Sequence, residues 1–248
     1  MSTPGSSGSR RIFIECFETL CRRHSRWNVW SDFVYLTAAE ISNSVDKVHA
    51  DERNEQGRQL AARYSESGMQ LFGKMFSAVV DGLEENRDQD FLGGIFMELN
   101  LGNEHNGQFF TPYSLCKCMA ALSADDLRDK PWISAGDPAC GAGAMLIALA
   151  NHYLETGVNY QERVLFVGQD IDCTAALMCY IQLSLLGCPG YVVIGDTISK
   201  PNITCDRHGL VPVDDGRVWY TPMYFRDIWQ IRRCCALLDA LEQSGPER

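Results

Sequence analysis

Short apolar runs alternate with amphipathic segments over residues 132–196. The apolar runs are 132–135, 164–167 and 191–194, and apolar residues at helical spacing occupy 144–154 and 174–186. This order of strand, helix, strand, helix, strand predicts a parallel sheet with right-handed crossovers. In open sheets of this kind, a ligand binds beyond the carboxyl ends of the strands. The chain is therefore expected to be an α/β protein with a ligand site at that end of its sheet.

An aspartate follows each of the three predicted strands. These residues are Asp137, Asp170 and Asp196. A single aspartate in such a place is commonly a helix cap or a solvated loop residue, but three at consecutive strand ends favour a shared ligand site. Asp170 is suited to accept both hydroxyls of a ribose, and Asp196 lies within expected reach of the exocyclic amine of an adenine.

The strongest local signal is the segment Asp137-Pro-Ala-Cys-Gly-Ala-Gly143, between the first strand and its helix. Glycines permit a positive φ and a close approach of ligand to backbone, and the following helix offers unpaired N–H groups. A phosphate-binding P-loop is not indicated, because no Gly-Lys-Ser/Thr follows. A dinucleotide fingerprint is not indicated either, since its third glycine would fall at Leu146.

The residues before the sheet are typical of helices. Apolar residues recur at intervals of three and four from 12 to about 101, and the glycine- and asparagine-rich residues 100–107 mark a boundary. We therefore expect a disordered N-terminus at 1–11, a helical N-terminal region at 12–106 and an α/β domain at 107–248.

Composition excludes several classes of protein. With 46% hydrophobic and 22% charged residues, the chain is an ordinary globular protein, and no apolar run is long enough to span a bilayer. The N-terminal residues lack the apolar core of a secretory signal, and 11 scattered cysteines suit a reducing cytoplasm without a zinc site. A net charge of −10 predicts that any DNA binding by the chain alone is weak and steeply salt-dependent.

Four blocks together resemble the N6-adenine DNA methyltransferases, in particular the methylase subunits of type I restriction-modification systems. The blocks are Gly-Gln-Phe-Phe-Thr-Pro at 107–112, the 137–143 loop, Gly-Gln-Asp-Ile-Asp at 168–172 and Gly-Asp-Thr at 195–197. The resemblance covers about residues 91–199. It implies a Rossmann-like methyltransferase fold with a mostly parallel, truncated sheet, S-adenosylmethionine as cofactor, and methyl transfer to the N6 atom of adenine in DNA.

The resemblance also implies roles for individual residues. Phe110, Thr111 and Pro112 would cover the methionine end of the cofactor. The loop would line it through Asp137, Ala139, Gly141 and Gly143. Asp170 would hold the ribose and Asp196 the adenine, and no metal is implied. A specificity subunit or a second methylase subunit would be the protein partner.

The target side departs from the family pattern. Enzymes of this kind carry Asn or Asp, two prolines and an aromatic residue, which hold a flipped base. This sequence has no Pro-Pro, and its nearest candidate is Thr221-Pro222-Met223-Tyr224. We take Thr221, Pro222 and Tyr224 as candidate catalytic residues of a degenerate loop, with an ordinary proline turn as the alternative. Only 24 residues follow Tyr224, so either the sheet is small or a partner completes it.

Three functions stay open at this point. The first is an adenine-N6 DNA methyltransferase that needs another subunit. The second is a catalytically inactive, cofactor-binding accessory or regulatory protein of a modification system or mobile element. The third, a methyltransferase for a small molecule or protein, is disfavoured by the block at 107–112, which resembles the DNA enzymes in particular.

Overall fold

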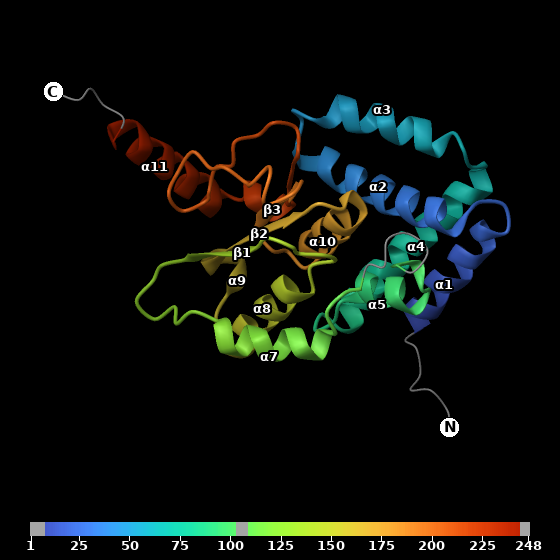
Figure 1. The fold of residues 1–248 in the computed structure, drawn as a ribbon, viewed down its shortest axis with the longest axis horizontal. Coiled ribbons are helices and arrows are strands. Elements are labelled where there is room, and N and C mark those ends of the chain that lie inside the picture. Colours follow the sequence, from blue (N-terminus) through green and yellow to red (C-terminus); the bar gives the residue numbers. More distant parts are fainter. Residues whose placement is uncertain (1–7, 103–108, 244–248) are drawn as a thin grey trace.

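The computed structural model describes residues 8–102 and 109–243. Its first part is a group of helices, drawn blue to teal in Figure 1. These are α1 (Gly8–Cys21), α2 (Arg26–Val45), α3 (Ala50–Ala61), α4 (Glu66–Glu85) and α5 (Phe91–Glu98). Side chains at the N-termini of three helices accept a backbone N–H, as N-caps do: Ser25 for α2, Ser65 for α4 and Asp90 for α5.

The second part alternates strands and helices as the sequence predicts. Its elements are α7 (Tyr113–Ser123), β1 (Ile133–Asp137), α8 (Ala144–Glu155), α9 (Tyr160–Arg163), β2 (Val164–Asp170), α10 (Cys173–Leu185), β3 (Gly190–Ile194), β4 (Val218–Tyr220), the 3₁₀ helix η1 (Pro222–Phe225) and α11 (Asp227–Gln243). The expected α/β fold with a helical N-terminal region is confirmed.

The four strands form one sheet in the order β1-β2-β3-β4. The first three are parallel, with Gly136 opposite Val167 and Gly168 opposite Val192. Their carboxyl ends therefore meet at one end of the sheet. β4 is antiparallel to β3, with Val218 opposite Val193 and Tyr220 opposite Tyr191, so β4 runs away from that end.

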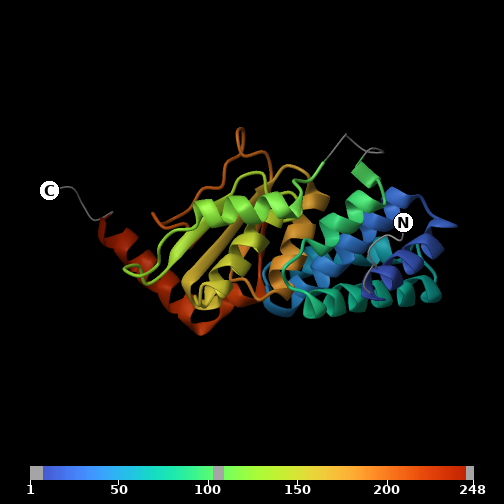
Figure 2. The same ribbon diagram turned by 90° about the horizontal axis from the view of Figure 1, so that it is seen from below.

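Both faces of the sheet are covered. One face packs on α8 and α10, and its core continues into the helical region through Trp30, Phe91 and Phe166. The other face packs on η1 and α11 around Tyr191 and Trp229. Figure 2 shows α10 at the junction between the sheet and the N-terminal helices. The helical region and the sheet thus share one core.

A buried arginine fastens the helical region to β4. Arg53 lies over the ring of Trp219, with 3.9 Å between its Cζ atom and the ring centroid. Its guanidinium donates to the carbonyl of Val218 at 2.8 Å and to the carboxylate of Asp46 at 2.8 Å. Stacking together with two charge-assisted hydrogen bonds makes a buried arginine tolerable.

One boundary differs from that expected. Helix α1 begins at Gly8 rather than at residue 12, because Ser9 donates to Glu85 and Arg10 pairs with Glu98 at 2.6 Å. β4 is antiparallel to β3, so the segment that follows β4, beginning at Thr221, lies at the amino end of β3. Within the described ranges, no helix combines the length and apolarity that crossing a membrane requires.

Candidate functional site

The carboxyl ends of β1 and β2 enclose a small cavity of about 160 Å³. Its walls come from the loop after β1, the end of β2 and the segment before α7. They are lined by Phe109, Phe110, Thr111, Cys116, Asp137, Ala139, Cys140, Gly141, Ala142, Ala144, Met145 and Asp170. Six residues expected from the sequence at a cofactor site thus line one cavity: Phe110, Thr111, Asp137, Ala139, Gly141 and Asp170.

Two glycines of the loop are required by its shape. Gly141 has a φ of +53°, and a Cβ there would lie 3.1 Å from the Phe110 ring. Gly143 has a φ of +95°, and a Cβ there would lie 2.8 Å from the Sγ atom of Cys179. Both positions combine a left-handed backbone with a close approach, so only glycine fits without strain. Gly143 shapes the turn into α8 and does not line the cavity.

Asp170 holds the glycine loop against the end of β2. One carboxylate oxygen accepts the N–H of Gly141 at 2.8 Å and the other accepts the N–H of Asp172 at 2.9 Å. The residue is 8% exposed. Each oxygen keeps a second lone pair, so the carboxylate can still accept from a ligand hydroxyl.

Asp137 lies at the end of β1, where its carboxyl group is partly removed from water. Burial raises the pKa of its carboxyl, the N–H of Ala139 lowers it, and the negative charge of Asp170 raises it further. Two nearby carboxylates in a partly dry cavity favour a positively charged or hydrogen-bond-donating ligand group. The cavity is therefore chemically matched to an amine, a hydroxyl or a sulfonium.

Asp196 lies apart from this cavity. Its carboxylate accepts the N–H of Ile198 at 2.9 Å and the hydroxyl of Ser199 at 2.8 Å, and these bonds lower its pKa. The next residue, Thr197, donates its hydroxyl to the carbonyl of Pro138. The end of β3 is thereby tied to the loop after β1, although the Asp196 carboxylate caps its own turn.

The segment before α7 closes the cavity from the side. Phe110 packs on Gly141 and on Phe96, with 5.1 Å between the two ring centroids. Pro112 is the N-cap residue of α7, and its carbonyl accepts the N–H groups of Leu115 and Cys116. Gly107 and Gln108 lie outside the described residues.

The structure does not bring the candidate catalytic loop to this site. Because β4 is antiparallel, Thr221 lies at the amino end of β3, opposite the end that carries the cavity. Its buried hydroxyl donates to the carbonyl of Cys188 at 2.7 Å and accepts the N–H of Gly190 at 3.0 Å. Pro222 begins η1. The hydroxyl of Tyr224 donates to the carbonyl of Leu210 at 2.7 Å. These contacts are structural.

Sequence reasoning missed a buried glutamine that supports the loop. Gln182 of α10 donates to the Asp90 carboxylate at 2.8 Å and to the carbonyl of Ala142 at 2.9 Å, and it accepts the N–H of Leu92 at 3.0 Å. It thereby joins the helical region to the glycine loop. The sequence does hold one indication of this role, since Gln182 is the one polar residue within the otherwise apolar residues 175–183.

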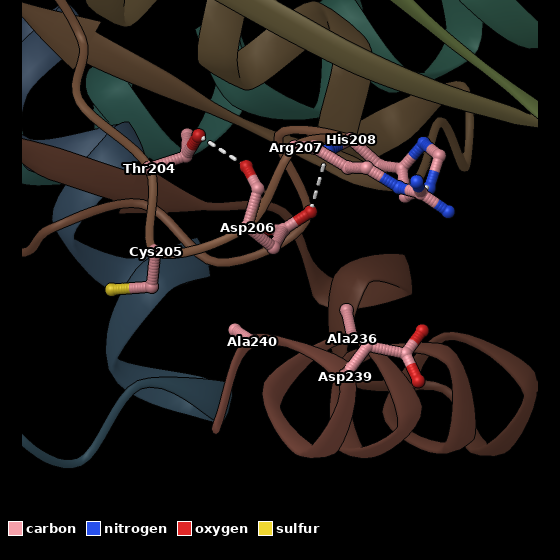
Figure 3. Close-up of a pocket in the computed structure, with 8 residues that line it drawn as sticks. All are labelled: Thr204, Cys205, Asp206, Arg207, His208, Ala236, Asp239 and Ala240. Carbon is pink, nitrogen blue, oxygen red and sulfur yellow. Dashed lines mark hydrogen bonds between the residues drawn. The ribbon is translucent and has the colours of Figure 1, made fainter. Parts of the chain in front are cut away.

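A second hollow of about 410 Å³ lies between the 204–208 loop and α11. Figure 3 shows Asp206 bound to its own loop. Its carboxylate accepts the N–H groups of His208 and Val211, both at 2.8 Å, and its carbonyl accepts the hydroxyl of Thr204. Since these bonds shape the loop itself and none of the strand-end aspartates lines the hollow, the cavity at β1 and β2 is the better ligand site.

The fold and the cavity define a Rossmann-like α/β protein with a small cavity at the carboxyl ends of its parallel strands, the place where sheets of this kind bind ligands. A family model described as N-6 DNA Methylase matches residues 90–214, half of the chain. The chain belongs to this family, whose cofactor is S-adenosylmethionine.

Two known proteins are similar over parts of their length. The methylase subunit of the type I restriction enzyme MjaIX from Methanocaldococcus jannaschii is 26% identical over an alignment 137 residues long, which covers 46% of this chain and 24% of that protein. A type I restriction-modification methyltransferase subunit from Streptococcus thermophilus is 14% identical, with a TM-score of 0.43 over 79% of this chain and 60% of that one. The chain spans about a quarter of the length of the curated relative.

Proposed function

We propose that this chain binds S-adenosylmethionine and forms the cofactor-binding part of an adenine-N6 DNA methylase. One observation carries the proposal: Asp170, Gly141 and Phe110 converge on one cavity at the carboxyl ends of parallel strands. Family membership supports the choice of cofactor, which supplies the methyl group when it is bound.

The residues of the site have separate tasks in this proposal. Asp170 accepts the ribose hydroxyls with the lone pairs that the backbone leaves unused. Asp137 and Ala139 line the methionine end, and Phe110 covers it. Asp196 accepts from the adenine amine, either with its second lone pairs or after releasing Ser199.

DNA recognition then requires groups beyond those of the cavity. A net charge of −10 gives little attraction to phosphate, and the sequence carries no Pro-Pro to stiffen a base-binding loop. We propose that a specificity subunit or a second methylase subunit supplies these groups, in the cytoplasm, where the cysteines stay reduced.

A catalytically inactive accessory protein is the second candidate. The placement of Thr221 and Tyr224 at the far end of the sheet favours it, because both side chains are committed to structural hydrogen bonds. Such a protein would bind the cofactor and transfer nothing by itself.

Two measurements on the full chain test the proposal. Calorimetry with S-adenosylhomocysteine should show binding at one site, and absence of both heat and thermal stabilisation would refute the cofactor assignment. Incubation of mixed-sequence DNA with methyl-labelled S-adenosylmethionine should give little N6-methyladenine by mass spectrometry. Rapid methylation by the chain alone would exclude the accessory role and the need for a second subunit.

A further inference from the structure

Helix α5 supports the cavity at β1 and β2 from outside, although none of its residues is among those that line it. The helix packs on both α4 and α10 (Figure 1). At its N-terminus, the Asp90 carboxylate accepts the N–H of Gly93 and the side-chain amide of Gln182, both at 2.8 Å. Nearer its C-terminus, Phe96 packs on Phe110, which covers the cavity. The two ends of α5 therefore reach two different walls of one cavity.

The amide of Gln182 joins the start of α5 to the glycine loop. Its Nε2 atom donates to Asp90 and to the carbonyl of Ala142, and its Oε1 atom accepts the N–H of Leu92 at 3.0 Å. These three bonds use both N–H groups of the amide and fix which end of it is the donor. Because Gln182 is 0% exposed, bulk water does not replace a partner that moves away. Leu92 and Ala142 are thus held to one another through a single side chain.

The glycine loop rests on the same face of α10. Cys179 precedes Gln182 by three residues, which places both side chains on one face of the helix. A Cβ at Gly143 would lie 2.8 Å from the Sγ atom of Cys179, so loop and helix are in direct contact there. Ala142 lies between Gly143 and the cavity that it lines. A shift of the Ala142 carbonyl would therefore move a wall of the cavity.

The aromatic cover depends on α5 as well. Phe96 is buried and meets Trp30 of α2, with 5.6 Å between the ring centroids. On its other side it meets Phe110, with 5.1 Å between the centroids. Phe110 in turn lies so close to Gly141 that a Cβ there would be 3.1 Å from its ring. Displacement of α5 would therefore disturb the cover and the Ala142 wall together.

We propose that Gln182 is a positioning residue of the glycine loop and that Asp90 orients it, so that the cavity takes its ligand-binding shape only when α5 is docked. Docking of α5 and binding in the cavity are then linked, and each stabilises the other to the same extent. The link between α5 and the loop exists without any ligand. Its effect on S-adenosylmethionine and S-adenosylhomocysteine rests on the proposed function.

Amide hydrogen exchange in the ligand-free full chain, followed by NMR, tests the link from the side of α5. Asp90→Ala removes the cap of α5 and one partner of Gln182. Exchange of the Gly143 and Ile147 amides, on the loop side of Gln182, should become faster by about tenfold. Ser65→Ala is the matched control, because it removes the cap of α4, another helix of the same region. The control should leave the Gly143 and Ile147 amides unchanged.

A second pair of variants tests the link at its centre. Gln182→Met keeps the length of the side chain but removes its three hydrogen bonds. Exchange of the Leu92 and Gly143 amides should become faster together, by about tenfold. Tyr64→Phe is the control, because it removes another buried hydrogen bond of the helical region, the one from Tyr64 to Asp32 at 2.8 Å. Asp90→Ala added to Gln182→Met should not speed exchange of Gly143 further, since its route to the loop is already broken.

The ligand is added in a separate step. S-adenosylhomocysteine should slow exchange of the Leu92 amide in the unaltered chain but not in Gln182→Met, and calorimetry should show binding to Gln182→Met that is weaker by about tenfold. If the ligand has no effect on any chain while the ligand-free differences are present, the cofactor assignment fails and the link stands.

The inference is overturned if Asp90→Ala leaves exchange of Gly143 and Ile147 unchanged, or if Ser65→Ala speeds it equally. It is also overturned if Gln182→Met affects only one of the Leu92 and Gly143 amides. Should Asp90→Ala fail to fold, judged by urea unfolding, the comparison of Gln182→Met with Tyr64→Phe decides by the same measurement.

Discussion

The Oδ2 atom of Asp170 accepts the N–H of Gly141 at 2.8 Å, across 29 residues of sequence. This bond places the carboxylate where it shapes the glycine loop and faces the cavity at once. Asp170 therefore has a structural role that needs no ligand, because it fixes the conformation of the loop that lines the cavity.

Replacement of that carboxylate should weaken cofactor binding. Asp170→Ala removes the proposed ribose acceptor and releases Gly141, so we expect S-adenosylhomocysteine affinity to fall by about 1–3 kcal/mol in calorimetry. Asp172→Ala is the control, because Asp172 caps α10 through the N–H of Ala175 at 2.8 Å and does not line the cavity. Equal losses in both variants would refute the assignment of Asp170.

The close approach of Gly141 to Phe110 gives a second prediction. Gly141→Ala adds a Cβ at 3.1 Å from the ring and strains a φ of +53°. Gly157→Ala strains a φ of +80° with nothing within 4 Å. Both should lower the free energy of unfolding in urea, by about 1 kcal/mol for the strain. Only Gly141→Ala should also weaken S-adenosylhomocysteine binding, because only this substitution displaces the Phe110 ring that covers the cavity.

The burial of Asp137 predicts a pH-dependent stability difference. Its pKa is raised above the unfolded value, chiefly by burial, so the ionised form destabilises the native state. Asp137→Asn should therefore unfold at higher urea concentration at neutral pH. The gain should be full above the folded pKa and should vanish as pH falls through that pKa to the unfolded value. A gain that is constant across this range would contradict the burial argument.

The sequence was most informative for the segment in which the spacing of apolar residues predicts the strands and also places the residues of the cavity. The run of strands and helices from 132 to 196, the loop glycines and the acid at 170 were all read from spacing, because parallel strands place their carboxyl ends together.

Contacts distant in sequence were not predictable in the same way. Nothing in the residues 217–224 specifies whether β4 pairs parallel beside β1 or antiparallel beside β3. That choice depends on packing with Arg53 and Tyr35, which meet Trp219 from the helical region. Gln182 was missed for the same reason, because its partners Leu92 and Ala142 come from two other parts of the chain.

The position of Thr221 leads to the last prediction. Thr221→Val keeps the shape of the side chain but leaves the Gly190 N–H and the Cys188 carbonyl without the hydroxyl in a fully buried place. Because an unsatisfied buried polar group costs about 1–3 kcal/mol, the free energy of unfolding should fall by that amount. S-adenosylhomocysteine affinity should not change, since Thr221 lies at the opposite end of β3 from the cavity. Thr156→Val on the exposed end of α8 is the control and should have little effect on either quantity. If Thr221→Val instead lowers cofactor affinity or residual methyl transfer at unchanged stability, the segment from Thr221 to Tyr224 belongs to the active site and β4 must pair on the other side of the sheet.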